Sequence, residues 1–460
     1  MSIEVISSNF IPNSSSSAID AFGDDNSDGA TISSSDTGVI AQDVTVAVGG
    51  NISNTAGMER FQLVVNGDGY ADDQAFDHLA LEFDFDVNTY QHRVTVSVGA
   101  SVTSLLQLGR FGDISQDTTL FANSEMFFNN AGSLTSLTSK GLTFQAIIDV
   151  DVINSGSMTV QEDQVLEFNA IRNVAVTNSG TLTSLSSTST STAALEDNSA
   201  VVFASTTRNV EFVNSGTITG PVGALFSRVS GTEVVTKSAT MDGTVRLSNS
   251  TDSMYTNTGL VLVAVFSQGG ENILDNSGEI TGNVGLGFGA LSRLDNTGEI
   301  GGNVSGGGGT EIVCNDGHIA QGLQLRGGND VVNNTGTILG GIDLNIDDDR
   351  LFNAGTVEGD VIQGFGDAAV SNIGTMNGDI SLGNGDDRLN NLGEIVGNIA
   401  TGGDDDRITN QGTIIGAVTT GAGADTVLNR GTIDGNVILG EDEENEGDTF
   451  DGRGGTVTGT

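Results

Sequence analysis

Cysteine, proline, aromatic and basic residues are scarce in this chain, and each scarcity excludes a class of protein. The 460 residues include one Cys, two Pro and no Trp, so no disulfide framework can form. Lys and Arg number 16 against 60 Asp and Glu, which gives a formal charge of −44. A charge of this sign and size argues against nucleic acid and anionic membrane surfaces as partners.

Long hydrophobic runs are also missing. No stretch approaches the roughly 18 consecutive apolar residues that span a bilayer. The first residues, Met1–Val5, lack the basic and apolar regions of a secretory signal peptide. We therefore expect no membrane insertion and, if the protein is exported, a route without an N-terminal Sec signal.

Glycine, in contrast, is abundant with 66 residues, and much of it belongs to an internal repeat. An Asn precedes x-Gly ten times, at Asn257, Asn276, Asn296, Asn315, Asn334, Asn353, Asn372, Asn391, Asn410 and Asn429. The spacings are 19, then 20, then seven times 19 residues. Positions are counted from this Asn, so that the unit Asn372–Asn390 has Asn372 at position 1 and Asp387 at position 16. Apolar residues alternate within each unit, which is the period of a β-strand.

This repeat predicts an all-β fold, a parallel β-helix or β-solenoid, in which one 19-residue unit with two short strands and Gly-rich corners forms one coil. A single coil cannot bury its apolar edge alone, whereas stacked coils share a continuous core. The Asn at position 1 is predicted to stack inward as a ladder, each amide bonding to the next. The Gly at position 3 is predicted to be a turn residue with positive φ.

The N-terminal half shows the same alternation at less regular spacing. Segments that end at Val98, Asn130, Asn154, Asn178 and Asn214 align with one another, and the spacings up to Asn257 are 32, 24, 24, 36 and 43 residues. Such spacings predict large, irregular coils with extra strands or loops. We therefore expect a flexible or capping segment at 1–40, an irregular solenoid with large coils at 41–256, and a regular solenoid of 19-residue coils at 257–460.

A further coil begins at Asp448 and the sequence stops at Thr460. An open solenoid end exposes unpaired strand edges. We expect either a longer natural chain or a partner that covers this end.

The second half of each regular coil carries a Gly-Asp corner, and in register these corners form two adjacent acidic columns. One column contains Asn329, Asp348, Asp367, Asp386 and Asp405, and the other contains Asp330, Asp349, Asp387, Asp406 and Asp425, interrupted by Ala368. Carboxylates stacked ~4.8 Å apart repel one another unless water, salt or a cation screens them. The alternative is a solvated face in which Gly-Asp serves only as turn chemistry.

Ca²⁺ would relieve this repulsion because it is a hard cation that prefers oxygen ligands. The predicted calcium ligands are Asp330, Asp348, Asp349, Asp367, Asp386, Asp387, Asp405, Asp406 and Asp425. Three arginines directly follow the Asp pairs and are predicted to form ion pairs at the rim of the corner: Arg350, Arg388 and Arg407.

The corners resemble those of the RTX family of calcium-binding repeat proteins, whose nonapeptide G-G-x-G-x-D-x-U-x is matched by Gly383–Leu389 and Gly421–Val427. The other half of the coil, N-x-G-x-I-x-G-x-I, is similar instead to repeats of bacterial autotransporter passengers and other surface adhesins. The coil also has 19 residues where two nonapeptides would have 18. The resemblance implies a secreted bacterial solenoid with an extracellular or cell-surface location.

Other candidate sites are less complete. The segment from Asp24 to Ser35 matches the first half of an EF-hand loop, but its twelfth position is Ser35 where Glu is needed. Asn66–Asp73 is a similar acidic loop. Cys314 lies between Val313 and a ladder Asn, which predicts a small core or ladder residue and argues against a nucleophile.

The sequence therefore predicts no enzyme but a structural or adhesive scaffold: a surface-layer protein, a filament or an adhesin stalk. The expected partners are further copies of the chain, in a lattice, filament or oligomer, and cell-surface glycans. One alternative is a bacteriophage tail fibre or tailspike. Another is a β-helix polysaccharide lyase or epimerase, for which the three widely separated histidines His78, His92 and His318 supply few basic groups.

Overall fold

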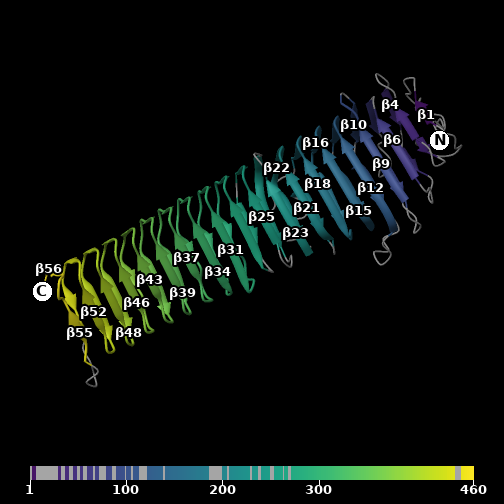
Figure 1. Ribbon diagram of the computed structural model, residues 1–460. Helices are drawn as coiled ribbons and strands as arrows, with labels where there is room; N and C mark the ends of the chain where they lie inside the picture. The colour runs from purple at the N-terminus through teal and green to yellow at the C-terminus, as the bar shows by residue number, and fades with distance from the viewer. Residues whose placement is uncertain are drawn as a thin grey trace. The chain divides into compact units, whose positions relative to one another are not determined.

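The computed structural model divides the chain into two compact units, Met1–Ser253 and Met254–Thr460. The residues that the structure describes are 3–6, 30–32, 37–40, 45–48, 52–54, 60–65, 68–71, 79–84, 90–98, 100–104, 107–112, 122–137, 140–185, 199–204, 207–227, 230–236, 240–248, 253–262, 264–267, 271–440 and 447–459. These residues form strands and turns without any helix. The predicted all-β parallel β-helix is confirmed, since the strands of successive coils pair in parallel (Figure 1).

Each coil of the second unit contributes one strand to a first ladder of parallel strands. Every strand of this ladder except β55 ends at the Asn of position 1. The strands of this ladder are β25 (Ser253–Asn257), β28 (Asn272–Asn276), β31 (Leu291–Asn296), β34 (Thr310–Asn315), β37 (Val331–Asn334), β40 (Arg350–Asn353), β43 (Ala369–Asn372), β46 (Arg388–Asn391), β49 (Arg407–Asn410), β52 (Thr426–Asn429) and β55 (Thr449–Asp451).

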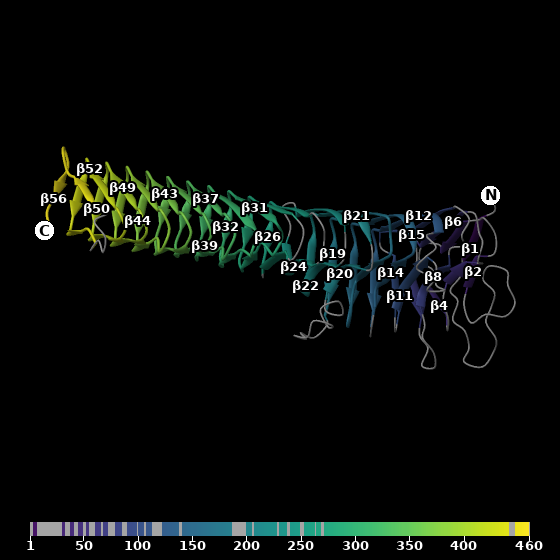
Figure 2. The same ribbon diagram turned by 90° about the horizontal axis from the view of Figure 1, so that it is seen from below.

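Two further ladders complete the coil (Figure 2). The second ladder, at positions 4 to 6, contains β26 (Leu260–Val261), β29 (Glu279–Ile280), β32 (Glu299–Ile300), β35 (His318–Ile319), β38 (Thr337–Ile338), β41 (Thr356–Val357), β44 (Thr375–Asn377), β47 (Glu394–Val396), β50 (Thr413–Ile415), β53 (Thr432–Asp434) and β56 (Thr456–Val457). The third, from position 9, contains β27 (Ala264–Ser267), β30 (Val284–Gly285), β33 (Val304–Ser305), β36 (Leu323–Gln324), β39 (Ile342–Ile346), β42 (Val361–Phe365), β45 (Ile380–Ser381), β48 (Ile399–Gly403), β51 (Val418–Ala422) and β54 (Val437–Ile438).

The prediction of two strands in each coil was therefore wrong, because the residues from position 17 to the next position 1 form a strand of their own. In β46, the outward Arg388 alternates with the buried Leu389, and the outward Asn390 with the buried Asn391. This strand is short and every second residue is polar, so its sequence is easily mistaken for that of a corner.

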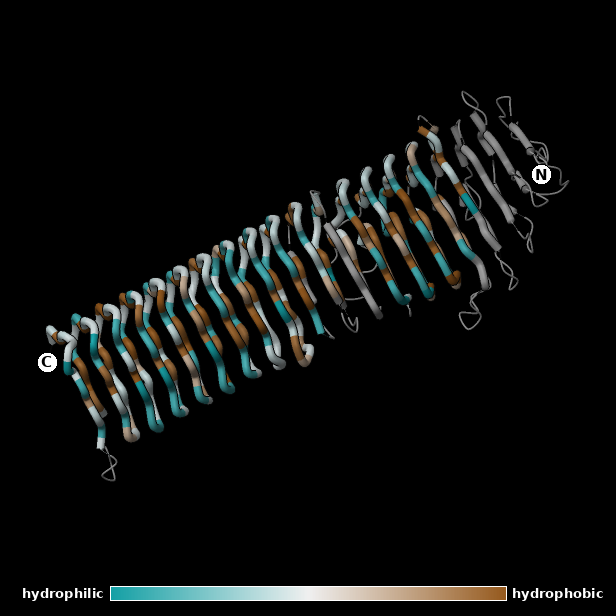
Figure 3. Tube along the Cα trace, in the orientation of Figure 1, coloured by the Kyte–Doolittle hydropathy of each residue, from teal (hydrophilic) through white to brown (hydrophobic). Residues whose placement is uncertain are grey.

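The core of the second unit consists of columns of identical positions. Position 5 is fully buried in nine successive coils, at Ile280, Ile300, Ile319, Ile338, Val357, Met376, Ile395, Ile414 and Ile433. Figure 3 shows the resulting alternation of apolar and polar residues along the strands. Because each coil buries the apolar edge of its neighbours, the coils are stable only as a stack.

The predicted Asn ladder is confirmed. From Asn257 to Asn429, the Nδ2 group of each ladder Asn donates to the Oδ1 atom of the next, at 2.7 to 2.9 Å. Each amide also donates to main-chain carbonyls, as Asn391 does to Thr413 and Gly393. These side chains are at most 1% exposed, so the ladder satisfies polar groups that have no access to water.

The predicted reason for the Gly at position 3, a turn with positive φ, was wrong. None of these glycines in the described coils has positive φ. The cause is close approach between coils: a Cβ atom on Gly298 would lie 2.0 Å from the carbonyl oxygen of Gly278, and one on Gly412 would lie 2.0 Å from that of Gly393. Glycine is needed here because the corner of the preceding coil occupies the space of a side chain.

The first unit, taken by itself, also has three ladders of parallel strands. The first contains β1 (Ile3–Ile6), β3 (Thr37–Ile40), β6 (Arg60–Val65), β9 (Tyr90–Val96), β12 (Ala122–Asn130), β15 (Ile147–Asn154), β18 (Asn173–Asn178), β21 (Arg208–Asn214) and β23 (Ser230–Thr236). The second contains β4 (Thr45–Val48), β7 (Asp68–Ala71), β10 (Ser101–Ser104), β13 (Ser133–Ser136), β16 (Ser157–Val160), β19 (Thr181–Ser184) and the start of β22 (Thr217–Ser227). The third contains β2 (Ala30–Ile32), β5 (Ile52–Asn54), β8 (Leu79–Asp84), β11 (Gln107–Gly112), β14 (Leu142–Gln145), β17 (Leu166–Asn169), β20 (Ser199–Ala204) and the end of β22. The long strand β24 (Thr240–Ser248) pairs with both parts of β22.

The register of the first unit corrects two alignments. Asn130 pairs with Val96 and not with Val98, which is 84% exposed. A slip of two residues keeps the alternation of apolar and polar residues, so the pattern alone cannot reveal it. Asn214 pairs with Thr236, so the interval of 43 residues to Asn257 contains an additional coil and not one large coil.

Aromatic stacking fills the wider core of the first unit. The rings of Phe111, Phe144, Phe168 and Phe203 are stacked with centroids 5.0, 5.1 and 4.8 Å apart. All four side chains are fully buried. They occupy one column of the third ladder, because identical side chains at equivalent positions of successive coils meet face to face.

We expect that replacing Asn391 by Ala lowers the stability of the second unit, because it removes one link of the ladder and leaves its neighbours without partners. An unpaired buried polar group costs about 1–3 kcal/mol. The midpoint of guanidinium unfolding measures the loss. Asn390→Ala is the matched control, since this residue is adjacent in β46 but exposed, and an equal effect of both substitutions would contradict a role for the ladder.

Candidate functional site

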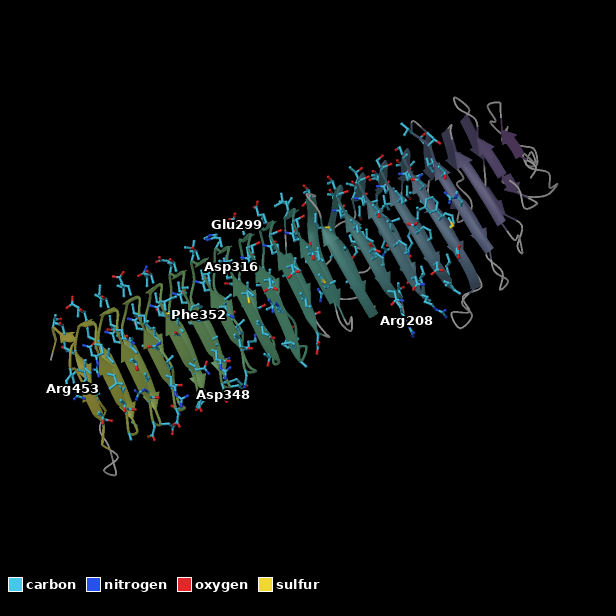
Figure 4. The ribbon with its side chains drawn as sticks, viewed as in Figure 1. Arg208, Glu299, Asp316, Asp348, Phe352 and Arg453 are labelled. Carbon is cyan, nitrogen blue, oxygen red and sulfur yellow. The ribbon has the colours of Figure 1, made fainter. Side chains whose placement is uncertain are left out.

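The acidic corner lies between the third ladder and the first ladder of each coil, at positions 12 to 16. The turn needs the left-handed conformation, which Gly385 supplies at position 14 with φ of 134°. At the same position, Asp347 and Asp404 adopt φ of 82° and 75°. These two coils therefore carry three consecutive aspartates in place of Gly-x-Asp. Figure 4 places Asp348 at the edge of the coils opposite that of Glu299 and Asp316.

The two predicted acidic columns exist in register, but they differ in environment. The column at position 16 points inward: Asp330, Asp349, Asp387, Asp406 and Asp425 are at most 2% exposed. The column at position 15 points outward, and Asp348, Asp367, Asp386 and Asp405 are exposed at the corner. We refer to them as the inner column and the outer column.

The inner column bonds to the main chain of the preceding coil. The Oδ1 atom of Asp349 accepts the N–H group of Asp330 at 2.7 Å, and that of Asp406 accepts the N–H group of Asp387 at 2.9 Å. Asp330, Asp387 and Asp425 accept N–H groups of the preceding coil in the same way. One oxygen of each inner carboxylate is therefore used to hold two coils together.

The second oxygen of each inner carboxylate is buried without a hydrogen-bond partner. This applies to the Oδ2 atoms of Asp330, Asp349, Asp387, Asp406 and Asp425 and to the Oε2 atom of Glu311 in the same column. Burial is the largest cause of raised pKa values there, about 8 for Asp330, about 7 for Glu311, Asp349 and Asp387, and about 6 for Asp406. A column of acceptors without donors needs a proton or a cation to be stable at neutral pH.

The inner column from Asp330 to Asp425 has one position without a carboxylate. Ala368 replaces Asp at position 16, and the same coil has the buried Gln363 at position 11, where the two adjacent coils have Leu344 and Leu382. The Nε2 group of Gln363 donates to the carbonyl oxygens of Asp347 and Phe365 at 2.5 and 3.2 Å. The amide thus supplies donors to a corner that lacks the carboxylate.

The outer column bonds in the opposite axial direction. The Oδ1 atom of Asp348 accepts the N–H group of Asp367 in the following coil at 3.0 Å, and Asp367 accepts that of Asp386 at 2.9 Å. The same bond joins Asp405 to Asp386, and Ala424 to Asp405. The two columns together fix each corner to the coil before it and to the coil after it.

The predicted ion pairs of the arginines that follow the aspartates were wrong. The ion pairs of the described residues include Lys140–Glu167, Arg293–Asp295, Arg430–Asp451 and Arg453–Asp451, and in this part of the chain Arg350, Arg388 and Arg407 form none. Position 17 lies on the outward face of the first ladder, where Arg388 pairs in register with Arg407 and both are exposed.

A third polar column at position 8 was missed. Its side chains lie at the outer corner between the second and third ladders. In each bond, a main-chain N–H group donates to the side-chain Oδ1 atom at position 8 of the preceding coil. The donor and acceptor residues are Asn303 and Asn283, Gly322 and Asn303, Asp379 and Asp360, Asn398 and Asp379, and Ala417 and Asn398. A signal was present in the sequence, since position 8 is Asn or Asp in six of the nine coils from Asn276 to Asn429.

The remaining candidates do not converge. Cys314 is partly exposed on the outward face of β34, so its prediction as a core or ladder residue was wrong. His78 and residues 441–446 lie outside the described residues. So do residues 24–29 and 33–35 of the EF-hand-like segment and residues 66, 67, 72 and 73 of the loop Asn66–Asp73. Among the residues that the structure describes, no three His, Cys, Asp or Glu side chains are grouped as a metal site. In the same residues, no helix is long and apolar enough to span a membrane.

We expect the second unit to lose stability as the pH rises, in chelator, from about 4 to about 8. Burial raises the pKa of Asp387 in the folded state to about 7, so the folded state binds more protons than the unfolded state above the ordinary pKa of ~3.9. The stabilisation is complete below the unfolded pKa and is lost as the pH passes the folded pKa. Melting temperatures across this range measure the effect.

Asp387→Asn should reduce this pH dependence because the amide does not titrate. Asp386→Asn, one residue away in the outer column, is the control that should retain it. A pH profile that is unchanged in Asp387→Asn would contradict the assignment of the titration to the inner column.

Comparisons with protein families, with curated proteins and with solved structures find no match for this chain. Its place among parallel β-solenoids therefore depends on the strand pairing and the repeated columns described above.

Proposed function

We propose that the chain is a non-enzymatic structural or adhesive scaffold outside the cell, as a surface-layer protein, filament or adhesin stalk. The observation that supports this is the repetition of one surface along the second unit: the same residue types recur at the same outward positions, coil after coil. A repeated surface suits lateral or end-to-end contacts with further copies of the chain. The proposed location is extracellular or at the cell surface.

We further propose that calcium stabilises the acidic corner. The unpaired Oδ2 atoms of the inner column are buried acceptors at successive coils, and oxygen acceptors of this kind suit a hard divalent cation. The outer column adds exposed carboxylates one residue away. Because no three acidic side chains are grouped in the described residues, main-chain carbonyls or water would have to complete the coordination of each ion.

The calcium proposal predicts a higher melting temperature of the full chain in millimolar calcium than in chelator, because a ligand that binds only the folded state stabilises it. The gain is about 2.7 kcal/mol when the ligand concentration is 100 times the dissociation constant. Magnesium should have a smaller effect, since it gives up its water ligands reluctantly.

The double substitution Asp387→Asn with Asp406→Asn should abolish much of the calcium effect. The control is Glu299→Gln with Glu394→Gln, which removes the same charge from two exposed residues of position 4. Equal calcium effects in the two double variants would count against coordination at the inner column, and the absence of any shift in the wild type would reduce the acidic columns to turn chemistry.

The scaffold proposal predicts that the purified chain forms open polymers or remains monomeric, and that it cleaves no polysaccharide. Sedimentation velocity and electron microscopy measure the first property, and a panel of uronic acid and neutral polysaccharides the second. A closed trimer would favour a bacteriophage fibre or tailspike. Lyase or hydrolase turnover would overturn the scaffold in favour of an enzyme.

A further inference from the structure

The hydrogen-bonded column at position 8 has a gap of two coils. The N–H group of Gly322 still donates to Asn303 at 3.1 Å, and the column resumes where Asp379 donates to Asp360 at 2.8 Å. Between them, Gly322 and Gly341 have no side chain to accept a bond from the next coil. Within the described part of the chain, the N–H groups of Gly341 and Asp360 consequently have no acceptor.

A groove of about 600 Å³ lies at this gap. Gly322, Gly340 and Gly341 are among the residues that line it. Two exposed aliphatic side chains also line it, Leu339 from position 6 and Ile362 from position 10, which are 46% and 45% exposed. The groove is thus partly apolar, and its two free N–H groups lie on adjacent coils ~4.8 Å apart along the axis.

The polar lining adds acceptors to these donors. Asp343 and Asp360 supply carboxylates, and Gln321 and Gln324 supply amides. An anionic ligand would be repelled by the two carboxylates and by the charge of the chain. A ligand for this groove must therefore not be an anion. It must accept bonds from N–H groups, donate bonds to carboxylates, and offer C–H surface to Leu339 and Ile362.

We propose that this groove binds a neutral saccharide chain that lies along the axis of the coils. A hydroxyl group both accepts and donates, so it matches the free N–H groups and the carboxylates at once. The C–H faces of pyranose rings cover the aliphatic side chains. An extended saccharide also rises per sugar by a distance close to the coil spacing, so successive sugars can lie opposite successive coils.

This inference deepens the adhesive part of the proposed function and depends on it. It assigns a ligand class to one place in a surface that is otherwise repetitive. In five other coils of this column, the side chain at position 8 closes the same place by accepting a bond from the next coil, as Asp379 does from Asn398. Ala417 interrupts the column in a single coil, whereas Gly322 and Gly341 are adjacent. The gap at Gly322 and Gly341 is therefore what makes these coils different.

Isothermal titration of the full chain, in millimolar calcium, tests the proposal with cellohexaose, laminarihexaose and chitohexaose as neutral probes and with a galacturonate hexamer as the anionic probe. We expect at least one neutral probe to bind and the anionic probe not to bind. The double variant Leu339→Ser with Ile362→Ser should weaken the neutral probe by about tenfold or more, which corresponds to about 1.4 kcal/mol.

The matched control is Ile415→Ser with Ile438→Ser, which removes side chains of the same two positions, 40% and 50% exposed, from coils outside the groove. It should change the affinity less than twofold. Filling the gap by Gly322→Asn is less suitable, because a Cβ atom there would lie 2.4 Å from the carbonyl oxygen of Gly341. Both double variants should keep the melting temperature of the wild type within a few degrees.

Failure of all neutral probes to bind at millimolar concentration would overturn the proposal, as would binding that survives the groove variant. Tighter binding of the galacturonate hexamer, or of an uncharged extended peptide that the groove variant abolishes, would also overturn it. A wild-type chain that binds no saccharide but keeps its calcium-dependent melting would remove the groove and leave the calcium-stabilised scaffold in place.

Discussion

The polar side chains that a coil turns toward the interior bond to the coil above or below, because the neighbouring coils exclude water from them. Some bond within their own coil as well, as Asn391 does to Gly393. The Asn column shows the solution in its simplest form, since each side chain donates to the next and accepts from the one before. The same requirement fixes where the Asn of one coil lies relative to the Asn of the next, and not the number of residues between them. The ladder continues across the 20-residue interval from Asn276 to Asn296 and the 36-residue interval from Asn178 to Asn214.

The acidic corner meets the same requirement with aspartate, which has a second carboxylate oxygen that this bond does not use. An Asn at position 16 would accept the N–H group of the preceding coil as well as Asp does, and its Nδ2 group would bring a donor into the corner. Aspartate instead leaves a buried oxygen with no donor to face it. Two carboxylates ~4.8 Å apart repel each other by roughly 3–4 kcal/mol at an effective dielectric constant of ~20. That the chain retains aspartate in five coils despite this cost is what favours a proton or a cation as part of the folded state.

The sequence carries enough information to predict the solenoid, because the recurrence of Asn before x-Gly and the alternation around Ile414 are properties of single coils that repeat. It also predicts which residues share a column. It does not directly show which column is buried: Asp386 and Asp387 are neighbours of the same type, and only counting back from the buried Leu389 through the strand alternation places Asp387 inside. The register of the first unit was beyond reach for a different reason. A displacement from Val96 to Val98 preserves alternation, so both alignments satisfy the same pattern.

Identical coils also determine where specific recognition can arise. A column that repeats without interruption offers the same contacts at every step, so a ligand bound to it has no preferred position along the axis. Position is specified only where a column is broken, and the second unit has few breaks that alter its surface. Ala368 breaks the inner column, but this break lies inside the core and leaves the surface unchanged. The glycines at Gly322 and Gly341 break an outer column, and no residue of the described coils takes over the two donors. In a repetitive protein, a departure from the repeat that is left uncompensated at the surface is therefore a better indication of recognition than the repeat itself.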